Sequence, residues 1–197
     1  MKFYESGDNR KPVIFLFPGT CCQYSSFDHV LDGLHSYFYT VAVSYDGFDS
    51  NEKTEFYSME DECEKIEQEI RTKYGGRIKA AYGCSLGGSF VSLLIQRKRI
   101  HIDYGIIGSS DMDEAGNLVA KIQASMVVPF MYKMIHTGAL PKFMQKKLNK
   151  TDEVKKELYN GFLNMFGIGK GGNPWITKQS IYNQFYSDLV TKVQHGI

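Results

Sequence analysis

A glycine-flanked serine is the residue whose surroundings point most directly to chemistry. Residues 83–87 read Gly-Cys-Ser-Leu-Gly, a Gly-x-Ser-x-Gly motif. The run 78–82 before it has β character, and the pattern from 86 to about 98 is helical. A serine on such a turn has a strained backbone and an exposed hydroxyl, and only small residues fit beside it. We predict that Ser85 is a nucleophile; an ordinary turn serine is the alternative.

A serine that attacks an acyl carbonyl also needs hydrogen-bond donors for the oxyanion. In a strand-turn-helix geometry one donor is the backbone N–H of the next residue, here Leu86. The second lies in the loop after the first central strand, here residues 17–20. Pro18 has no N–H, whereas Thr20 has one and Gly19 allows close approach. We predict that Thr20 and Leu86 form the oxyanion hole, where each donor is worth about 3 kcal/mol.

The elements that must position these residues alternate along the first half of the chain. Apolar runs predict strands at 13–17, 39–44, 78–82 and 104–108. Helical patterns cover about 26–37, 56–74 and 86–98. This alternation predicts the α/β class, with a parallel sheet and helices on both faces. Gly19, Asp46, Ser85 and Asp111 then fall at the carboxyl ends of strands, where such sheets bind ligands.

The second half of the chain has a helical pattern without a clear strand. It covers residues 114–172, and Pro129 is expected to break or kink it. One apolar face is expected at Leu118, Val119, Ile122 and Met126. Thr177 is expected to cap a last helix. We therefore predict a core at 1–113, a helical cap insertion at 114–174 and a returning helix at 175–197.

These motifs resemble the α/β-hydrolase superfamily, and most closely the small cap-bearing esterase and lipase-like members found in bacteria. The resemblance covers residues 12–111: Pro18-Gly19-Thr20 stands in place of a His-Gly-x oxyanion loop, and 83–88 forms the nucleophile elbow. Residues 112–197 fit only loosely. The resemblance implies a Ser-Asp/Glu-His triad in that chain order and no metal or organic cofactor. It also implies hydrolysis of an ester, thioester or amide.

The acid and the base of such a triad are assigned less directly. Some hydrolases of this fold take the acid from the end of the strand after the nucleophile helix, where Asp111 stands. A helix-capping role is the alternative, and Asp113 is its rival. Three histidines follow the serine. His101 is expected at the opposite end of the sheet, His136 in the cap, and His195 late in the chain without a strand to position it. None is assigned as the base.

The chain departs from the family after the cap. A complete member has two more strands there, which carry the acid and then the histidine, but only 112 residues follow Ser85. If the protein is a serine hydrolase of this family, we expect the sequence to be a piece of a longer protein or to be completed by a partner chain. The strand 104–108 is expected to be an open edge. We expect the C-terminal segment or a second copy of the chain, in a homo-oligomer, to cover it.

Composition limits the other classes of function. The net charge is +1 and no basic stripe is present, which argues against a nucleic-acid partner. The N-terminus lacks the apolar region of a secretory signal, and apolar runs such as 13–17 are too short to span a bilayer. The four cysteines form no Cys-x-x-Cys pair and are read as reduced thiols in a cytoplasmic protein.

Three functions remain open from the sequence. The first is a serine hydrolase that acts on a small acyl-containing substrate. The second is a non-catalytic protein of the same fold that binds a small apolar ligand under the cap. The third is an acyltransferase that keeps Ser85 but passes the acyl group to an acceptor other than water.

Overall fold

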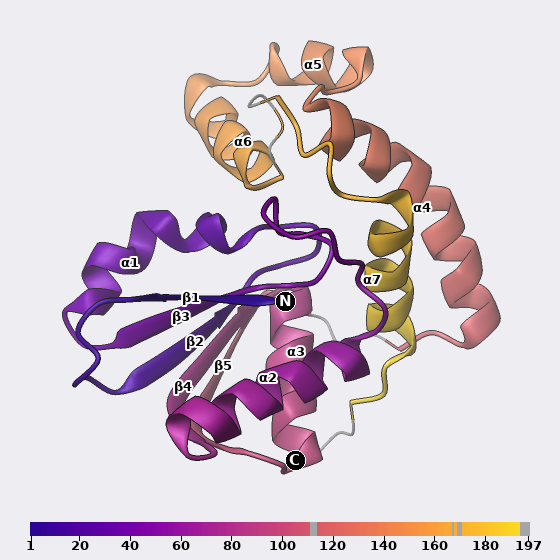
Figure 1. The fold of residues 1–197 in the computed structure, drawn as a ribbon. Coiled ribbons are helices and arrows are strands. Elements are labelled where there is room, and N and C mark those ends of the chain that lie inside the picture. Colours follow the sequence, from indigo (N-terminus) through magenta and orange to yellow (C-terminus); the bar gives the residue numbers. More distant parts are fainter. Residues whose placement is uncertain (111–113, 167, 169–170, 194–197) are drawn as a thin grey trace.

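A five-stranded sheet forms the centre of the molecule (Figure 1). The structure is a computed structural model, and it describes residues 1–110, 114–166, 168 and 171–193. The strands lie in the order β1-β3-β2-β4-β5. Their bounds are β1 (Lys2–Ser6), β2 (Val13–Phe17), β3 (Tyr39–Ser44), β4 (Arg77–Cys84) and β5 (His101–Gly108). Strands β2 to β5 are parallel and β1 is antiparallel to β3, so the predicted α/β class is confirmed.

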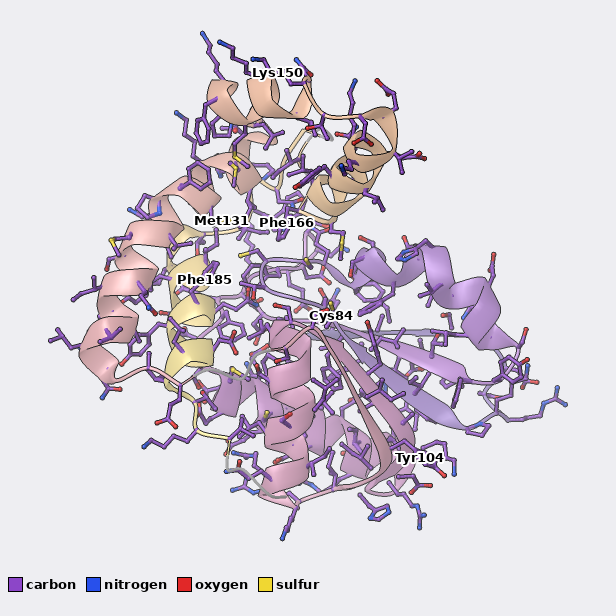
Figure 2. The ribbon with its side chains drawn as sticks, turned by 180° about the vertical axis from the view of Figure 1, so that it is seen from behind. Cys84, Tyr104, Met131, Lys150, Phe166 and Phe185 are labelled. Atoms are coloured by element: carbon purple, nitrogen blue, oxygen red, sulfur yellow. The ribbon has the colours of Figure 1, made fainter. Side chains whose placement is uncertain are left out.

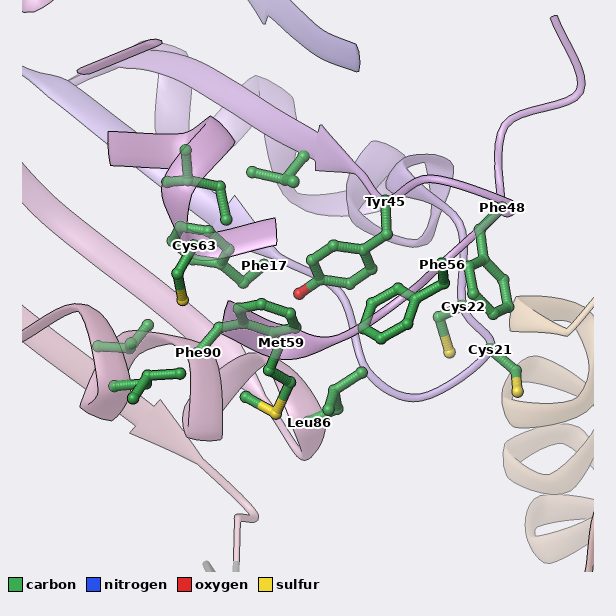
Figure 3. Packing of buried hydrophobic residues seen from close by; sticks show 14 of the residues in the cluster. Phe17, Cys21, Cys22, Tyr45, Phe48, Phe56, Met59, Cys63, Leu86 and Phe90 are labelled. Atoms are coloured by element: carbon green, nitrogen blue, oxygen red, sulfur yellow. The ribbon is translucent and has the colours of Figure 1, made fainter. Parts of the chain in front are cut away.

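Helices cover both faces of this sheet. The first four are η1 (Tyr24–Phe27), α1 (Asp28–His35), α2 (Met59–Tyr74) and α3 (Leu86–Arg97). On one face Ile14, Leu16 and Phe27 form a small cluster with the inner side of α1. On the other face α2 and α3 cover the main core. There the Phe90 ring stacks on the rings of Tyr45 and Phe17, with ring centroids 4.7 Å and 6.4 Å apart (Figure 3).

Helix α2 begins three residues later than its sequence pattern predicts. Ser58 is its N-cap, and the Ser58 hydroxyl accepts a hydrogen bond from the Asp61 N–H at 3.1 Å. Phe56 lies outside the helix because its backbone is bonded elsewhere. Its N–H donates to Ser180 Oγ at 3.2 Å, and its carbonyl accepts from Asn183 Nδ2 at 2.7 Å.

The second half of the chain contains four helices among the described residues. They are α4 (Asn117–Thr137), α5 (Lys142–Leu148), α6 (Glu153–Met165) and α7 (Lys178–Val190). Helix α4 lies beside α7, and α5 and α6 follow beyond its C-terminal end (Figure 1). The predicted cap at Thr177 is confirmed, because its hydroxyl accepts from the Ser180 N–H at 3.0 Å. Of the predicted break or kink at Pro129, the break is wrong, because α4 runs through this residue, and the kink stays a prediction. Both Pro129 and Ser125 are exposed, so water can reach the carbonyl that the missing N–H leaves free.

The predicted apolar face of α4 is not its buried face. Leu118 and Met126 are 72% and 67% exposed, whereas Ala120, Ala124 and Val128 are buried on the side toward α7. Small side chains allow the two helices to approach closely, and periodicity alone did not distinguish the buried side of α4 from its exposed side.

By length and composition α4 is also apolar enough to cross a membrane. It does not stand out as an uninterrupted apolar run, because Lys121 and Lys133 lie within it.

The outer edge of β5 has no partner among the strands that the structure describes. Tyr104, Ile106 and Ile107 of this strand are between 42% and 60% exposed. Helix α7 packs against α2 and α4 instead. The expectation that the C-terminal segment covers this edge is therefore not met by the residues described up to Val193.

Candidate active site

Ser85 lies on a sharp turn between the end of β4 and the start of α3. Its backbone has φ +53° and ψ −122°, a conformation that residues other than glycine rarely adopt. The Ser85 N–H donates to the Gly108 carbonyl at 2.8 Å, and the Ser85 carbonyl accepts from the Gly88 N–H at 2.8 Å. The side chain is exposed. This is the strained, accessible geometry that the motif predicts for a nucleophile.

The glycines of the motif are needed because backbone passes close to them. A Cβ on Gly83 would collide with the backbone of Gly87 and Gly88. A Cβ on Gly87 would collide with the Phe17 carbonyl at the end of β2. The turn that carries Ser85 is therefore closely packed between helix α3, which follows it, and the neighbouring strand β2.

The loop after β2 reaches the same place. A Cβ built on Gly19 would lie 3.3 Å from the Cys84 carbonyl oxygen and 3.6 Å from Ser85 Cβ. Thr20 follows directly. Leu86 is the first residue of α3, where backbone N–H groups have no acceptor within the helix. The structure thus brings the Gly19–Thr20 backbone, Ser85 and Leu86 together at the rim formed by the carboxyl ends of the strands.

Contacts from three other segments hold this loop, residues 18–23, which is the candidate oxyanion loop and is called the oxyanion loop below. Tyr45 Oη donates to the Pro18 carbonyl at 3.2 Å. The Cys21 N–H donates to Gln184 Oε1 of α7 at 2.7 Å, and Gln23 Nε2 donates to Asn173 Oδ1 at 2.9 Å. Sequence reasoning missed the Gln184 and Asn173 contacts, because nothing in the local pattern links residues that are 150 or more positions apart.

Two of the cysteines near the site, Cys21 and Cys22, do not compete with the serine as nucleophiles. Cys21 and Cys22 are buried free thiols, as the sequence analysis expected. Burial raises the pKa of Cys22 to about 12 and that of Cys21 well above its ordinary value. Both stay protonated near neutral pH, and a thiol is a weak nucleophile in that form. Cys84 is half-buried at the carboxyl end of β4 (Figure 2).

The acid and the base are not among the residues that the structure brings to Ser85. Asp111, Asp113 and His195 lie outside the described residues. His101 begins β5, at the end of the sheet away from Ser85, as expected, and lies 3.1 Å from Asp103. His136 is in the last turn of α4 with its ring against Tyr132. Among the described histidines, none is hydrogen-bonded to the Ser85 hydroxyl.

Asp46, the other acidic residue at the rim, has a structural partner. Its carboxylate pairs with the Met1 ammonium and with Lys65. These cationic hydrogen bonds lower its pKa against the opposing effect of burial. Among the described residues, no group of histidine, cysteine, aspartate and glutamate side chains has the arrangement of a metal site.

A cavity of about 560 Å³ lies beside the oxyanion loop. One wall contains Gln23, Ser26 and His29, and the other contains Asn164 and Met165 of α6 with Trp175. Helix α6 thus faces the loop across this space, and Phe166 at its end lies between the cap and the sheet (Figure 2). An exposed serine on a strained turn and the loop after β2 therefore lie at one rim of the sheet, and this cavity lies next to that loop.

Comparison with solved structures identifies the fold as that of the α/β hydrolases. An alpha/beta hydrolase family protein from Desulfitobacterium hafniense superposes with a TM-score of 0.70 at 15% identity, over 96% of this chain and 72% of that one. MenH from S. aureus superposes with a TM-score of 0.68 at 11% identity, over 96% and 72%. A thermophilic esterase from Thermogutta terrifontis superposes with a TM-score of 0.68 at 13% identity, over 95% and 66%. No protein-family model or curated protein sequence matches the chain.

Proposed function

We propose that the protein is a serine hydrolase that cleaves a carboxylic ester, thioester or amide through an acyl-enzyme on Ser85. The observation that carries the proposal is the strained Ser85 turn with the Gly19–Thr20 backbone packed against it. The fold by itself is weaker support, because a 2,4-dioxygenase shares it with a TM-score of 0.60. The proposal therefore rests on the site.

In the proposed reaction Ser85 Oγ attacks the carbonyl carbon of the substrate and gives its proton to a base. The Thr20 and Leu86 N–H groups donate hydrogen bonds to the resulting oxyanion. The intermediate collapses, the leaving group departs with a proton, and water then hydrolyses the acyl-serine. We place the base, a histidine, outside the described residues. The cavity between the oxyanion loop and α6 is the proposed route for a small acyl substrate.

The test is intact-mass analysis after treatment with a fluorophosphonate, which phosphonylates an activated serine. We expect one adduct on the native chain and none on Ser85→Ala. Cys84→Ala is the matched control, because it changes the neighbouring side chain and leaves the hydroxyl, so it should still be labelled. A folded native chain that takes up no label would contradict the proposal.

Binding of a small apolar ligand without catalysis is the second candidate. The observation that favours it is that no described histidine reaches Ser85. Turnover of a chromogenic short-chain ester separates the two, since only the hydrolase releases the chromophore. Release that requires an added alcohol or amine would instead indicate an acyltransferase.

A further inference from the structure

We propose that Gln184 of α7 is a positioning residue, which holds the Thr20 N–H in the direction that oxyanion binding requires. This inference rests on the proposed function. The bond from the Cys21 N–H to Gln184 Oε1 is 2.7 Å long and buried, and the Gln184 side chain is fully buried. It joins residues 163 positions apart. A buried N–H that loses its acceptor is left unsatisfied away from water, so this bond stabilises the loop in the observed conformation.

The conformation of Cys21 shows why the bond matters locally. Cys21 has φ +59°, in the left-handed region, although it is not a glycine. Such a conformation is unfavourable for a residue with a Cβ atom and persists only where the surroundings impose it. The Gln184 bond acts on the N–H of this same residue.

Three successive peptide planes of the loop are each held by one hydrogen bond. Because a peptide group is planar, an acceptor for one N–H also fixes the direction of the carbonyl before it. The Pro18–Gly19 plane is held by Tyr45 Oη, and the Gly19–Thr20 plane by the Cys22 N–H, which donates to the Gly19 carbonyl at 3.0 Å. Gln184 holds the third, the Thr20–Cys21 plane. The Thr20 N–H belongs to the middle plane, so its direction depends on both neighbours.

The second donor of the same amide supports this reading. Gln184 Nε2 is buried and has no hydrogen-bond partner among the described residues. Leucine or methionine would fill a similar volume without this cost. The presence of an amide is therefore explained by the acceptor that it provides to the loop.

The test compares Gln184→Met with Asn183→Leu. Asn183 is the adjacent residue on α7, and its side-chain amide also bonds to backbone at 2.7 Å, but its partner is the Phe56 carbonyl. We expect Gln184→Met to lower kcat toward a short-chain ester, or the rate of phosphonylation, by about 10- to 100-fold with little change in KM, since removing an oxyanion donor costs about 10²–10³. Gln184→Glu keeps an acceptor and should restore most of the rate. Asn183→Leu should lower the melting temperature and leave kcat nearly unchanged.

A second readout does not depend on activity. Amide hydrogen exchange of residues 19–23 should speed up in Gln184→Met and remain unchanged in Asn183→Leu. If the wild type shows no labelling and no turnover, the proposed function fails, and this exchange measurement still decides the role of Gln184. Exchange in residues 19–23 that is equal in Gln184→Met and the wild type would overturn the inference. So would an unchanged kcat in an active enzyme.

Discussion

Ser85 adopts its unusual backbone conformation because its neighbours leave room for only one path of the chain. The strand before it ends against β2 and β5, and the helix after it starts within van der Waals contact of β2. Gly83 and Gly87 stand at the two points of closest approach. The residue types of the motif therefore follow from packing, and the exposed hydroxyl is a consequence of it.

Substitution of Gly87 tests this packing. Gly87→Ala should lower the free energy of unfolding by about 1–3 kcal/mol, because the new methyl group would collide with the Phe17 carbonyl. Urea denaturation measures the change. Gly161→Ala is the matched control: Gly161 lies in α6 with open space around it, so alanine there should stabilise by about 0.5–1 kcal/mol. Equal effects at the two positions would contradict the packing argument.

Thiol accessibility separates Cys84 from the other cysteines. Cys21, Cys22 and Cys63 are at most 4% exposed, whereas Cys84 is intermediate. A thiol reagent at about pH 8 should therefore modify Cys84 alone in the native protein, and all four cysteines after unfolding. Mass spectrometry counts the adducts, and native Cys84→Ala should show none. Rapid modification of Cys22 in the native state would contradict the burial of the oxyanion loop.

At the scale of elements, continuous apolar runs located the buried strands well. The predicted bounds of β2 and β3 are those observed, because strands that are buried on both faces form largely apolar runs. Strand β1 was missed: it is short and half-exposed, and its pairing with β3 joins segments that are distant in the sequence. The start of α2 was misplaced because bonds from α7 hold Phe56 in an extended segment. Tertiary contacts determine both the existence of β1 and the start of α2, and the local sequence pattern does not indicate such contacts.

Helix α2 carries a buried carboxyl that should make stability depend on pH. Glu62 is fully buried, and burial raises its pKa from 4.5 to about 7 despite its hydrogen bond with Lys65. Between these values the folded state binds more protons than the unfolded state, so the free energy of unfolding should fall as pH rises. The fall should reach up to about 3 kcal/mol and level off above about pH 7. Urea denaturation from about pH 5 to 8 measures it.

Two controls define the source of this dependence. Glu62→Gln should flatten the curve in that range, whereas Glu60→Gln, at an exposed position of the same helix, should not. Asp46 has a lowered pKa, so its contribution is lost only as pH falls below about 4, outside the measured range. A stability curve that rises from about pH 5 to 7 would contradict the assignment.

At the scale of the whole molecule, the sequence predicted the site only in part. Ser85, Thr20 and Leu86 could be found because a motif and a strand end place them within one sheet. Gln184 and Asn173 could not, because their contacts depend on how α7 and the end of the cap return to the oxyanion loop. No particular residue type indicates a side chain that positions a loop backbone, since any buried acceptor of suitable length could accept the hydrogen bond.

The unpaired edge of β5 concerns the whole molecule as well. An exposed strand with free N–H and carbonyl groups tends to pair with another strand, and two copies of one strand can pair antiparallel across a two-fold axis. Residues 104–108 are uncharged, with exposed Tyr104, Ile106 and Ile107, and the net charge of +1 causes little repulsion between copies. We propose that two copies pair through this edge.

Light scattering coupled to size-exclusion chromatography tests the pairing. The wild type should elute with the mass of a dimer at micromolar concentration and dissociate on dilution. Ile106→Lys should give a monomer, because a lysine on an edge strand opposes pairing. Leu118→Lys is the matched control, since Leu118 is equally apolar and 72% exposed but lies on α4. A dimer broken by Leu118→Lys and not by Ile106→Lys would move the interface to α4. A wild-type monomer at every concentration would mean that the β5 edge does not pair with a second copy.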